Sequence, residues 1–164
     1  MQQDAKSLRK ISKRMAYEIC PRVWFGPAGA TYNPEFMSRI THIVNCDNDR
    51  HSTNLWARNG RTFLFLESMD NDVFPILETH FARLKDFVDA ALASPENCVF
   101  LHCYLGINRS AALAVAYACY ATQKTAKEVI ANVRNAGKPI LLNHAFEQQL
   151  LGLFPPNDEV VQSV

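Results

Sequence analysis

The most informative segment of the chain is Val99-Phe-Leu-His-Cys-Tyr-Leu-Gly-Ile-Asn-Arg-Ser110. It begins within a short apolar run, Cys98 to Leu101, of the kind found in a buried central strand. The segment from Ser110 to Thr122 is almost entirely apolar and small, which predicts a buried helix. A loop between strand and helix can aim successive backbone N–H groups at one point near the positive end of the helix dipole.

The residues of this loop suit a phosphate group. Cys103 opens the loop, Arg109 closes it, and Gly106 permits backbone geometry that other residues resist. The guanidinium of Arg109 would add a bidentate, charge-assisted pair to the phosphate oxygens. We expect the backbone amides of the whole loop to bind phosphate, namely those of Tyr104, Leu105, Gly106, Ile107, Asn108 and Arg109.

Cys103 is predicted to be the nucleophile of this site. A free cysteine titrates near ~8.5, and helix N-termini and cations bring the pKa to roughly 3.5–7.5. The thiolate, not the thiol, attacks phosphorus. Cys20, Cys98 and Cys119 lack this context and are predicted to be small core residues.

The rest of the chain alternates between strand and helix patterns, which predicts an α/β fold with a central, mostly parallel sheet of about four to five strands and helices on both faces. The Asn33-Pro34 pair marks a helix start, and the polar segment 47–60 is predicted to be a loop. Strands are expected at Arg22–Phe25, Thr41–Cys46 and Thr62–Leu66, and helices at residues 4–16, Ile76–Ala93, Ala126–Asn135 and His144–Leu153.

Length and composition describe one ordinary globular domain. The chain has 164 residues, 48% hydrophobic and 20% charged, with a formal net charge of +1. A dedicated nucleic-acid binder usually has a larger basic excess. Five cysteines without any CxxC pair predict neither a disulfide framework nor a metal site. With no signal sequence and no membrane-spanning run, we expect a reducing, cytoplasmic location.

The segment from His102 to Ser110 resembles the HCxxGxxR(S/T) signature of cysteine-based protein phosphatases. The surrounding chain looks like the small dual-specificity phosphatases, including the poxviral ones. The resemblance implies a protein tyrosine phosphatase-like fold, a phosphocysteine intermediate on Cys103 and no cofactor. It implies that Ser110 helps the thiolate leave in the second step, and that His102 orders the loop and helps lower the cysteine pKa.

The resemblance also implies domain boundaries and roles for further residues. Residues 1–19 would be a helical extension, 20–154 the catalytic domain and 155–164 a flexible tail. The family's general acid is an aspartate after the third strand, which leaves Asp70 and, by a different count, Asp72. Asn143 would steady the phosphate loop, or simply cap the last helix.

Two features of the sequence each allow two interpretations. Cys46 ends a strand, and in some relatives a cysteine at this place forms a reversible disulfide with the catalytic one; the alternative is a core cysteine beside the site. The amphipathic helix predicted near the N-terminus would pack on its own domain, or dock on a second subunit to form a homodimer, as resemblance to the poxviral enzymes implies.

The expected activity is hydrolysis of phosphotyrosine and of phosphoserine or phosphothreonine in proteins, because the short chain has no insertions that would build a deep, phosphotyrosine-only pocket. Neutral residues inside the loop argue against phosphoinositides. An RNA 5′-phosphatase remains an alternative because Gly-Ile-Asn-Arg resembles that branch, although Ser110-Ala111 departs from its usual Thr-Gly. The other alternative is a phosphate-binding protein without activity.

Overall fold

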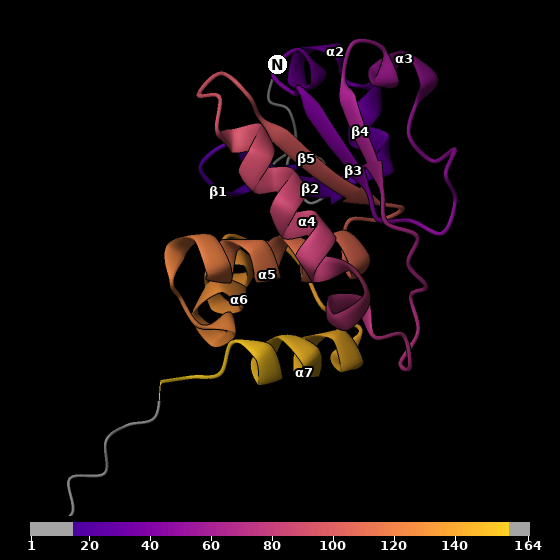
Figure 1. The fold of residues 1–164 in the computed structure, drawn as a ribbon. Coiled ribbons are helices and arrows are strands. Elements are labelled where there is room, and N and C mark those ends of the chain that lie inside the picture. Colours follow the sequence, from indigo (N-terminus) through magenta and orange to yellow (C-terminus); the bar gives the residue numbers. More distant parts are fainter. Residues whose placement is uncertain (1–14, 158–164) are drawn as a thin grey trace, which may run out of the picture.

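The computed structural model describes residues 15–157, which form a five-stranded sheet in the order β1-β2-β5-β3-β4 (Figure 1). The β2–β5, β5–β3 and β3–β4 pairs are parallel, whereas β1 and β2 are antiparallel. The strands are β1 (Tyr17–Cys20), β2 (Val23–Pro27), β3 (His42–Asn45), β4 (Thr62–Phe65) and β5 (Val99–Cys103). The helices are the 3-10 helix η1 (Ala28–Tyr32), α2 (Pro34–Met37), α3 (Leu55–Arg58), α4 (Ile76–Leu92), α5 (Arg109–Thr122), α6 (Ala126–Asn135) and α7 (His144–Leu153).

The parallel strands bring the functional segments to one edge of the sheet. β5 lies in the middle and every one of its residues is buried. Because β2, β3, β4 and β5 run the same way, the segments that follow them leave from the same edge, which is where ligands bind in open α/β sheets. Cys103 is the last residue of β5, Asp47 follows β3 and Asp70 follows β4.

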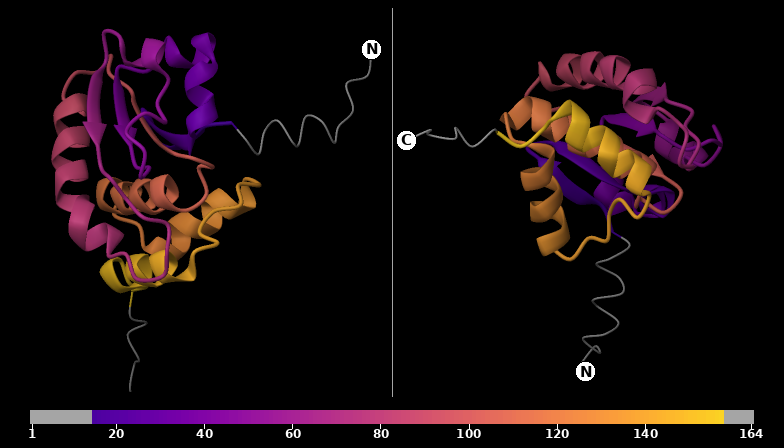
Figure 2. Two further views of the ribbon diagram at one scale, coloured as in Figure 1. Left: turned by 90° about the vertical axis from the view of Figure 1, so that its right-hand side faces the viewer. Right: turned by 90° about the horizontal axis from the view of Figure 1, so that it is seen from below.

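Helices cover both faces of the sheet. Alternate residues of the strands enter two separate cores, as the two-residue repeat of a strand requires. Val44 and Leu101 belong to the core under α4, α5, α6 and α7, and Ile43 and Phe100 to a smaller core that includes Met37 at the end of α2. Figure 2 shows α4 and the α2 region on opposite sides of the sheet.

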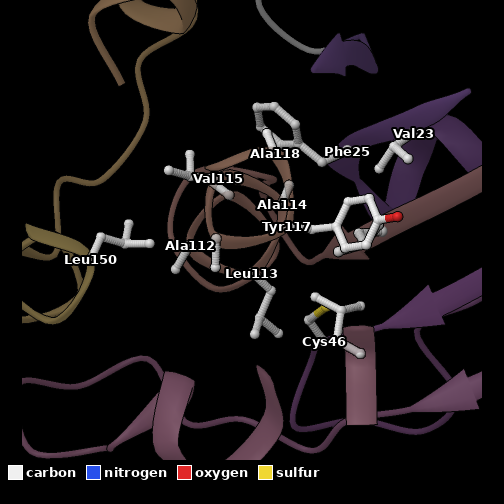
Figure 3. Packing of buried hydrophobic residues seen from close by; sticks show 14 of the residues in the cluster. Val23, Phe25, Cys46, Ala112, Leu113, Ala114, Val115, Tyr117, Ala118 and Leu150 are labelled. Atoms are coloured by element: carbon white, nitrogen blue, oxygen red, sulfur yellow. The ribbon is translucent and has the colours of Figure 1, made fainter. Parts of the chain in front are cut away.

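Helix α5 lies at the centre of the larger core. Every residue from Arg109 to Cys119 is buried. Figure 3 shows labelled core residues surrounding the helix, with Phe25 and Val23 from β2 on one side and Leu150 from α7 on another. Alanine occupies many of its positions, so neighbouring elements approach the helix closely, and the amino end of α5 is held firmly beside the end of β5.

The architecture expected from the sequence is confirmed, and most elements are within a residue or two of their predicted bounds. Three elements escaped prediction: β1, the 3-10 helix η1, and the four-residue helix α3 inside the segment expected to be a loop. Residues 17–19, assigned above to the helical extension, instead pair with β2 as the first strand. The helix predicted for residues 4–16 lies almost wholly outside the described residues, as does most of the predicted tail.

Between residues 15 and 157, no helix is long and apolar enough to cross a bilayer. The same part of the chain contains no group of three or more histidine, cysteine, aspartate or glutamate side chains that could hold a metal ion.

Candidate active site

Cys103 lies at the bottom of the site with its thiol beside a hydroxyl. The side chain is 2% exposed, and its Sγ is 3.2 Å from Oγ of the fully buried Ser110. The hydroxyl is also 3.5 Å from the carbonyl oxygen of Gly26. Ser110 is the second residue of α5, so the thiol and hydroxyl both lie at the positive end of that helix. The positive end of a helix favours a bound anion.

The loop between Cys103 and Arg109 folds tightly against β2. Gly106 has a φ of +70°, and a Cβ built there would lie 2.3 Å from the carbonyl carbon of Gly26 and 2.5 Å from the nitrogen of Pro27. Only glycine fits this position, because other residues resist a positive φ and because a Cβ would overlap the backbone of β2. The N–H of Leu141, itself at a φ of +60°, donates to the carbonyl of Ile107 and holds the loop from outside.

Backbone amides inside the loop remain free for a ligand. In the part of the chain that the structure describes, the N–H groups of residues 104–108 donate no hydrogen bond to a protein acceptor. Successive free amides at a helix amino end form a site for an anion. The structure thus brings together the loop that the sequence predicted to bind phosphate and the thiol beneath it.

Arg109 is buried and forms an ion pair that the sequence did not predict. Its Nη1 donates to Oδ1 of Asp47 at 2.7 Å and to the carbonyl oxygen of Ser68 at 3.3 Å. Asp47 is 3% exposed, and its backbone is tied to the same segment because its carbonyl accepts from the N–H of Ser68. The Nε of Arg109 is buried and has no protein partner. One end of the guanidinium is therefore fixed by the protein, while its Nε remains available to an oxyanion.

Asp70 is held over the loop by two amide side chains. Its Oδ2 accepts from Nδ2 of Asn108 at 3.0 Å, and its Oδ1 accepts from Nδ2 of Asn143 at 3.0 Å. Asn143 also caps α7 through its Oδ1, and its N–H donates to Oδ1 of Asn108. Asp72 is exposed and makes no such contact with the loop. Of the two aspartates left open by the sequence, the geometry favours Asp70.

His102 is a neutral, buried supporting residue. Its Nε2 is 2.6 Å from Oγ1 of the buried Thr53, so one ring nitrogen is fixed by a hydroxyl from the loop before α3. Burial lowers the pKa of His102 to about 4, despite the opposing effect of Asp47. At neutral pH it therefore orders the end of β5 without contributing a positive charge to the thiol.

Cys46 lies at the end of β3, fully buried and close enough to Cys103 for their charges to interact. Burial raises the pKa of its thiol well above the usual range, and Cys103 raises it further, while Arg109 acts in the opposite direction. Cys46 is therefore a neutral thiol. A reversible Cys46–Cys103 disulfide remains a prediction.

A pocket of about 520 Å³ opens above Arg109. Its lining includes Tyr32 and Tyr104, which are 68% and 67% exposed, and the acidic residues Asp47 and Asp49. A phosphorylated side chain that enters this pocket can therefore reach Arg109 beside aromatic and acidic residues.

Sequence reasoning missed two roles in this site. Asp47 gave no signal, because a single aspartate in a polar segment is indistinguishable from a solvated loop charge. Asn108 was predicted only for its backbone amide, yet its side chain bridges Asp70 and Asn143 instead of capping α5. Because Asn is itself a preferred N-cap residue, its position before α5 offered no clue to this role.

Comparison with known proteins places the chain among phosphatases. The family described as "Dual specificity phosphatase, catalytic domain" matches residues 25–154. Dual specificity protein phosphatase 26 of Homo sapiens is 30% identical over 148 residues, covering 88% of this chain and 69% of that protein. Dual specificity protein phosphatase 13B of Homo sapiens is 30% identical over 139 residues, covering 81% and 69%.

Solved structures agree with this placement. The crystal structure of the human tyrosine phosphatase-like serine/threonine/tyrosine-interacting protein has a TM-score of 0.75 and 27% identity, covering 85% of this chain and 95% of that one. The tyrosine phosphatase OH1 from the Orf virus has a TM-score of 0.69, covering 92% and 96%. At 19% identity, this viral structure supports the fold alone.

The Asp47–Arg109 pair predicts a graded response to substitution. Asp47→Ala removes the acceptor that orients Nη1, and we expect kcat/KM to fall at least tenfold. Asp47→Asn removes the charge but keeps an acceptor oxygen, so its loss should be several times smaller. Removing one partner of a buried pair is strongly destabilising, so melting curves must accompany the kinetics. Asp49→Asn, in the same loop, is the control, and equal kinetics for both Asp47 variants would contradict an orienting role.

The buried imidazole of His102 predicts a loss of stability in acid. The unfolded chain takes up this proton near pH 6.5 and the folded chain only near pH 4, so stability falls as the pH drops through this interval. The expected contribution is about 3 kcal/mol. Denaturant unfolding between pH 7 and 4 should show a shallower dependence for His102→Gln than for His144→Gln, whose wild-type side chain is 89% exposed. Identical slopes would refute the assignment.

Proposed function

Because the chain belongs to the dual specificity phosphatase family and is a protein phosphatase, we propose that it hydrolyses phosphotyrosine and phosphoserine or phosphothreonine through a phosphocysteine intermediate on Cys103. The observation that supports this most directly is the 3.2 Å contact between the Cys103 thiol and the Ser110 hydroxyl, at the base of a loop of free amides closed by Arg109. That arrangement provides a nucleophile, an oxyanion site and a donor to the departing sulfur.

In the first step the Cys103 thiolate attacks phosphorus while the loop amides and Arg109 bind the three equatorial oxygens. The bond to the substrate oxygen breaks, and Asp70 donates a proton to that oxygen, so the product leaves as an alcohol or phenol. Charge develops on the phosphoryl oxygens in a site that is already organised to receive it, which is the main source of electrostatic catalysis.

In the second step a water molecule attacks the phosphocysteine. Asp70, now ionised, accepts a proton from this water, and the phosphorus–sulfur bond breaks to release phosphate. The Ser110 hydroxyl donates a hydrogen bond to the sulfur as it becomes a thiolate again. The enzyme returns to its starting protonation state.

The surroundings of the site support dual specificity. The lining of the pocket above Arg109 includes the exposed side chains of Tyr32 and Tyr104, and we expect short phosphoserine and phosphothreonine side chains to reach the loop there. The aromatic rings of Tyr32 and Tyr104 can contact a phosphotyrosine ring. The Arg109 charge is already paired with Asp47, and the lining adds the further carboxylate of Asp49, which disfavours a polyanion such as RNA or a phosphoinositide headgroup.

Matched peptides test this proposal. We expect the reduced protein to release phosphate from phosphotyrosine and phosphothreonine peptides of otherwise identical sequence, without inhibition by EDTA. A 5′-triphosphorylated oligonucleotide should be a poor substrate, and Cys103→Ser should be inactive on all three. Preferential turnover of the oligonucleotide would favour an RNA 5′-phosphatase instead.

Substitution of Asp70 should affect substrates according to their leaving groups. Asp70→Asn keeps the shape but cannot donate the proton, so we expect kcat/KM on an alkyl phosphate to fall by about 10²–10⁴. The loss should be smaller on p-nitrophenyl phosphate, whose leaving group needs less protonation. Asp72→Asn is the matched control. If Asp72→Asn shows the leaving-group effect and Asp70→Asn does not, the general acid is Asp72.

Substitution of Ser110 should slow the second step selectively. Ser110→Ala removes the donor to the departing thiolate, so phosphocysteine accumulates and p-nitrophenol appears as a burst of about one equivalent before slow turnover. Rapid-quench or stopped-flow measurement would detect this burst. Slow kinetics without any burst would mean that Ser110 supports the first step instead.

A further inference from the structure

An apolar groove runs along the outer side of the phosphate loop. It has a volume of about 750 Å³, and its walls include Trp24, Ala30, Phe36 and Leu105. Cavities of this size accommodate one or two large side chains of a partner. None of the catalytic steps described above uses this groove.

The groove is built on a fixed aromatic base. The rings of Trp24 and Phe36 meet edge to face with centroids 5.6 Å apart, and Phe36 packs in the same way on the buried Phe100 at 5.0 Å. At its edges Met15 is 47% exposed and Leu105 is 62% exposed. An apolar surface that is both exposed and preformed marks an interaction site more often than an accident of packing.

The groove is continuous with the site of chemistry. Gly29 and Tyr104 line both this groove and the pocket that contains Arg109. Tyr104 directly follows Cys103 in sequence and is mostly exposed. Because it lines both the groove and the pocket, it lies between them. A peptide whose phosphate sits in the loop must therefore pass beside Tyr104, within reach of the groove.

We propose that this groove binds an apolar side chain of the phosphoprotein substrate, close in sequence to its phosphorylated residue. The proposal rests on the proposed function, since it takes the phosphate to be bound at Arg109. The enzyme would thus recognise an apolar anchor beside the phosphoresidue in addition to the phosphate itself.

The charges around the groove fit a peptide better than a polyanion. Its lining carries one carboxylate, Glu35, and one guanidinium, Arg39, so their formal charges cancel. A nucleic acid or an anionic lipid surface would instead require a cationic rim. Both charged side chains lie on exposed positions, where they can bind the polar backbone or flanking side chains of an extended peptide.

Steady-state kinetics on a peptide series tests the proposal. Each phosphotyrosine peptide carries leucine or glycine at one position within four residues of the phosphoresidue. Burial of a leucine side chain corresponds to roughly a tenfold to hundredfold gain. We expect kcat/KM to rise at least tenfold with leucine at one or two positions, with no preference at the others.

Variants assign the preference to the groove. Ala30→Glu and Met15→Glu introduce a carboxylate into its lining from two different segments, and each should reduce the leucine preference below threefold. Leu55→Glu is the control, because Leu55 is 71% exposed in α3 and outside the groove. Turnover of p-nitrophenyl phosphate, which has no peptide to reach the groove, should be unchanged in all three.

The outcomes separate this proposal from the proposed function. If wild-type protein turns over p-nitrophenyl phosphate but shows no leucine preference, the groove proposal is wrong while the phosphatase assignment stands. A leucine preference that survives both groove variants would place the apolar contact elsewhere and would also overturn the groove proposal. A leucine preference that emerges only after removal of residues 1–14 would mean that the chain's own N-terminal segment occupies the groove, and this result would overturn the proposal. Failure to turn over any phosphate ester would reject the proposed function itself.

Discussion

The site depends on the contact between Gly106 and β2, because it determines the shape of the phosphate loop. The loop must leave β5, enclose an anion-sized space and enter α5 within a few residues. It does so by pressing its backbone against Gly26 and Pro27, at a distance that leaves no room for a Cβ and with a φ suited to glycine. The hydrogen bond from Leu141 to Ile107 supports the loop from outside. The free amides follow from this packing, and Asp47 and Ser68 then orient the Arg109 guanidinium.

Parallel strands then bring the other groups to the loop without any long insertion. The segments after β3 and β4 leave the same edge of the sheet as Cys103, so Asp47 and Asp70 arrive from positions 56 and 33 residues earlier in the chain. Ser68 connects them, because its backbone contacts both Asp47 and Arg109 just before the segment of Asp70. Asp47 and Ser68 therefore orient the Arg109 guanidinium, while Asn108 and Asn143 hold Asp70.

The groups beneath the loop carry little net charge. His102 is neutral because burial lowers its pKa to about 4, and Cys46 is neutral because burial raises its pKa. Asp47 compensates part of the charge of Arg109. Oriented loop amides and the amino end of α5 therefore add a field that favours a bound anion. We expect such a site to bind a phosphate dianion through preorganised dipoles more than through net charge.

The sequence by itself determined the α/β architecture, the phosphate loop and the roles expected of Cys103 and Arg109, because these depend on residues that are neighbours in the chain. Local periodicity and cap residues likewise predicted α6 and α7 to the residue. Only the tertiary structure held Asp70 over the loop, paired Asp47 with Arg109, and turned the Asn108 side chain toward Asp70. These contacts join segments 38 to 62 residues apart, and β1 became a strand only because β2 offered it an edge. No local pattern encodes such contacts, since their energy exists only once the sheet has brought the segments together.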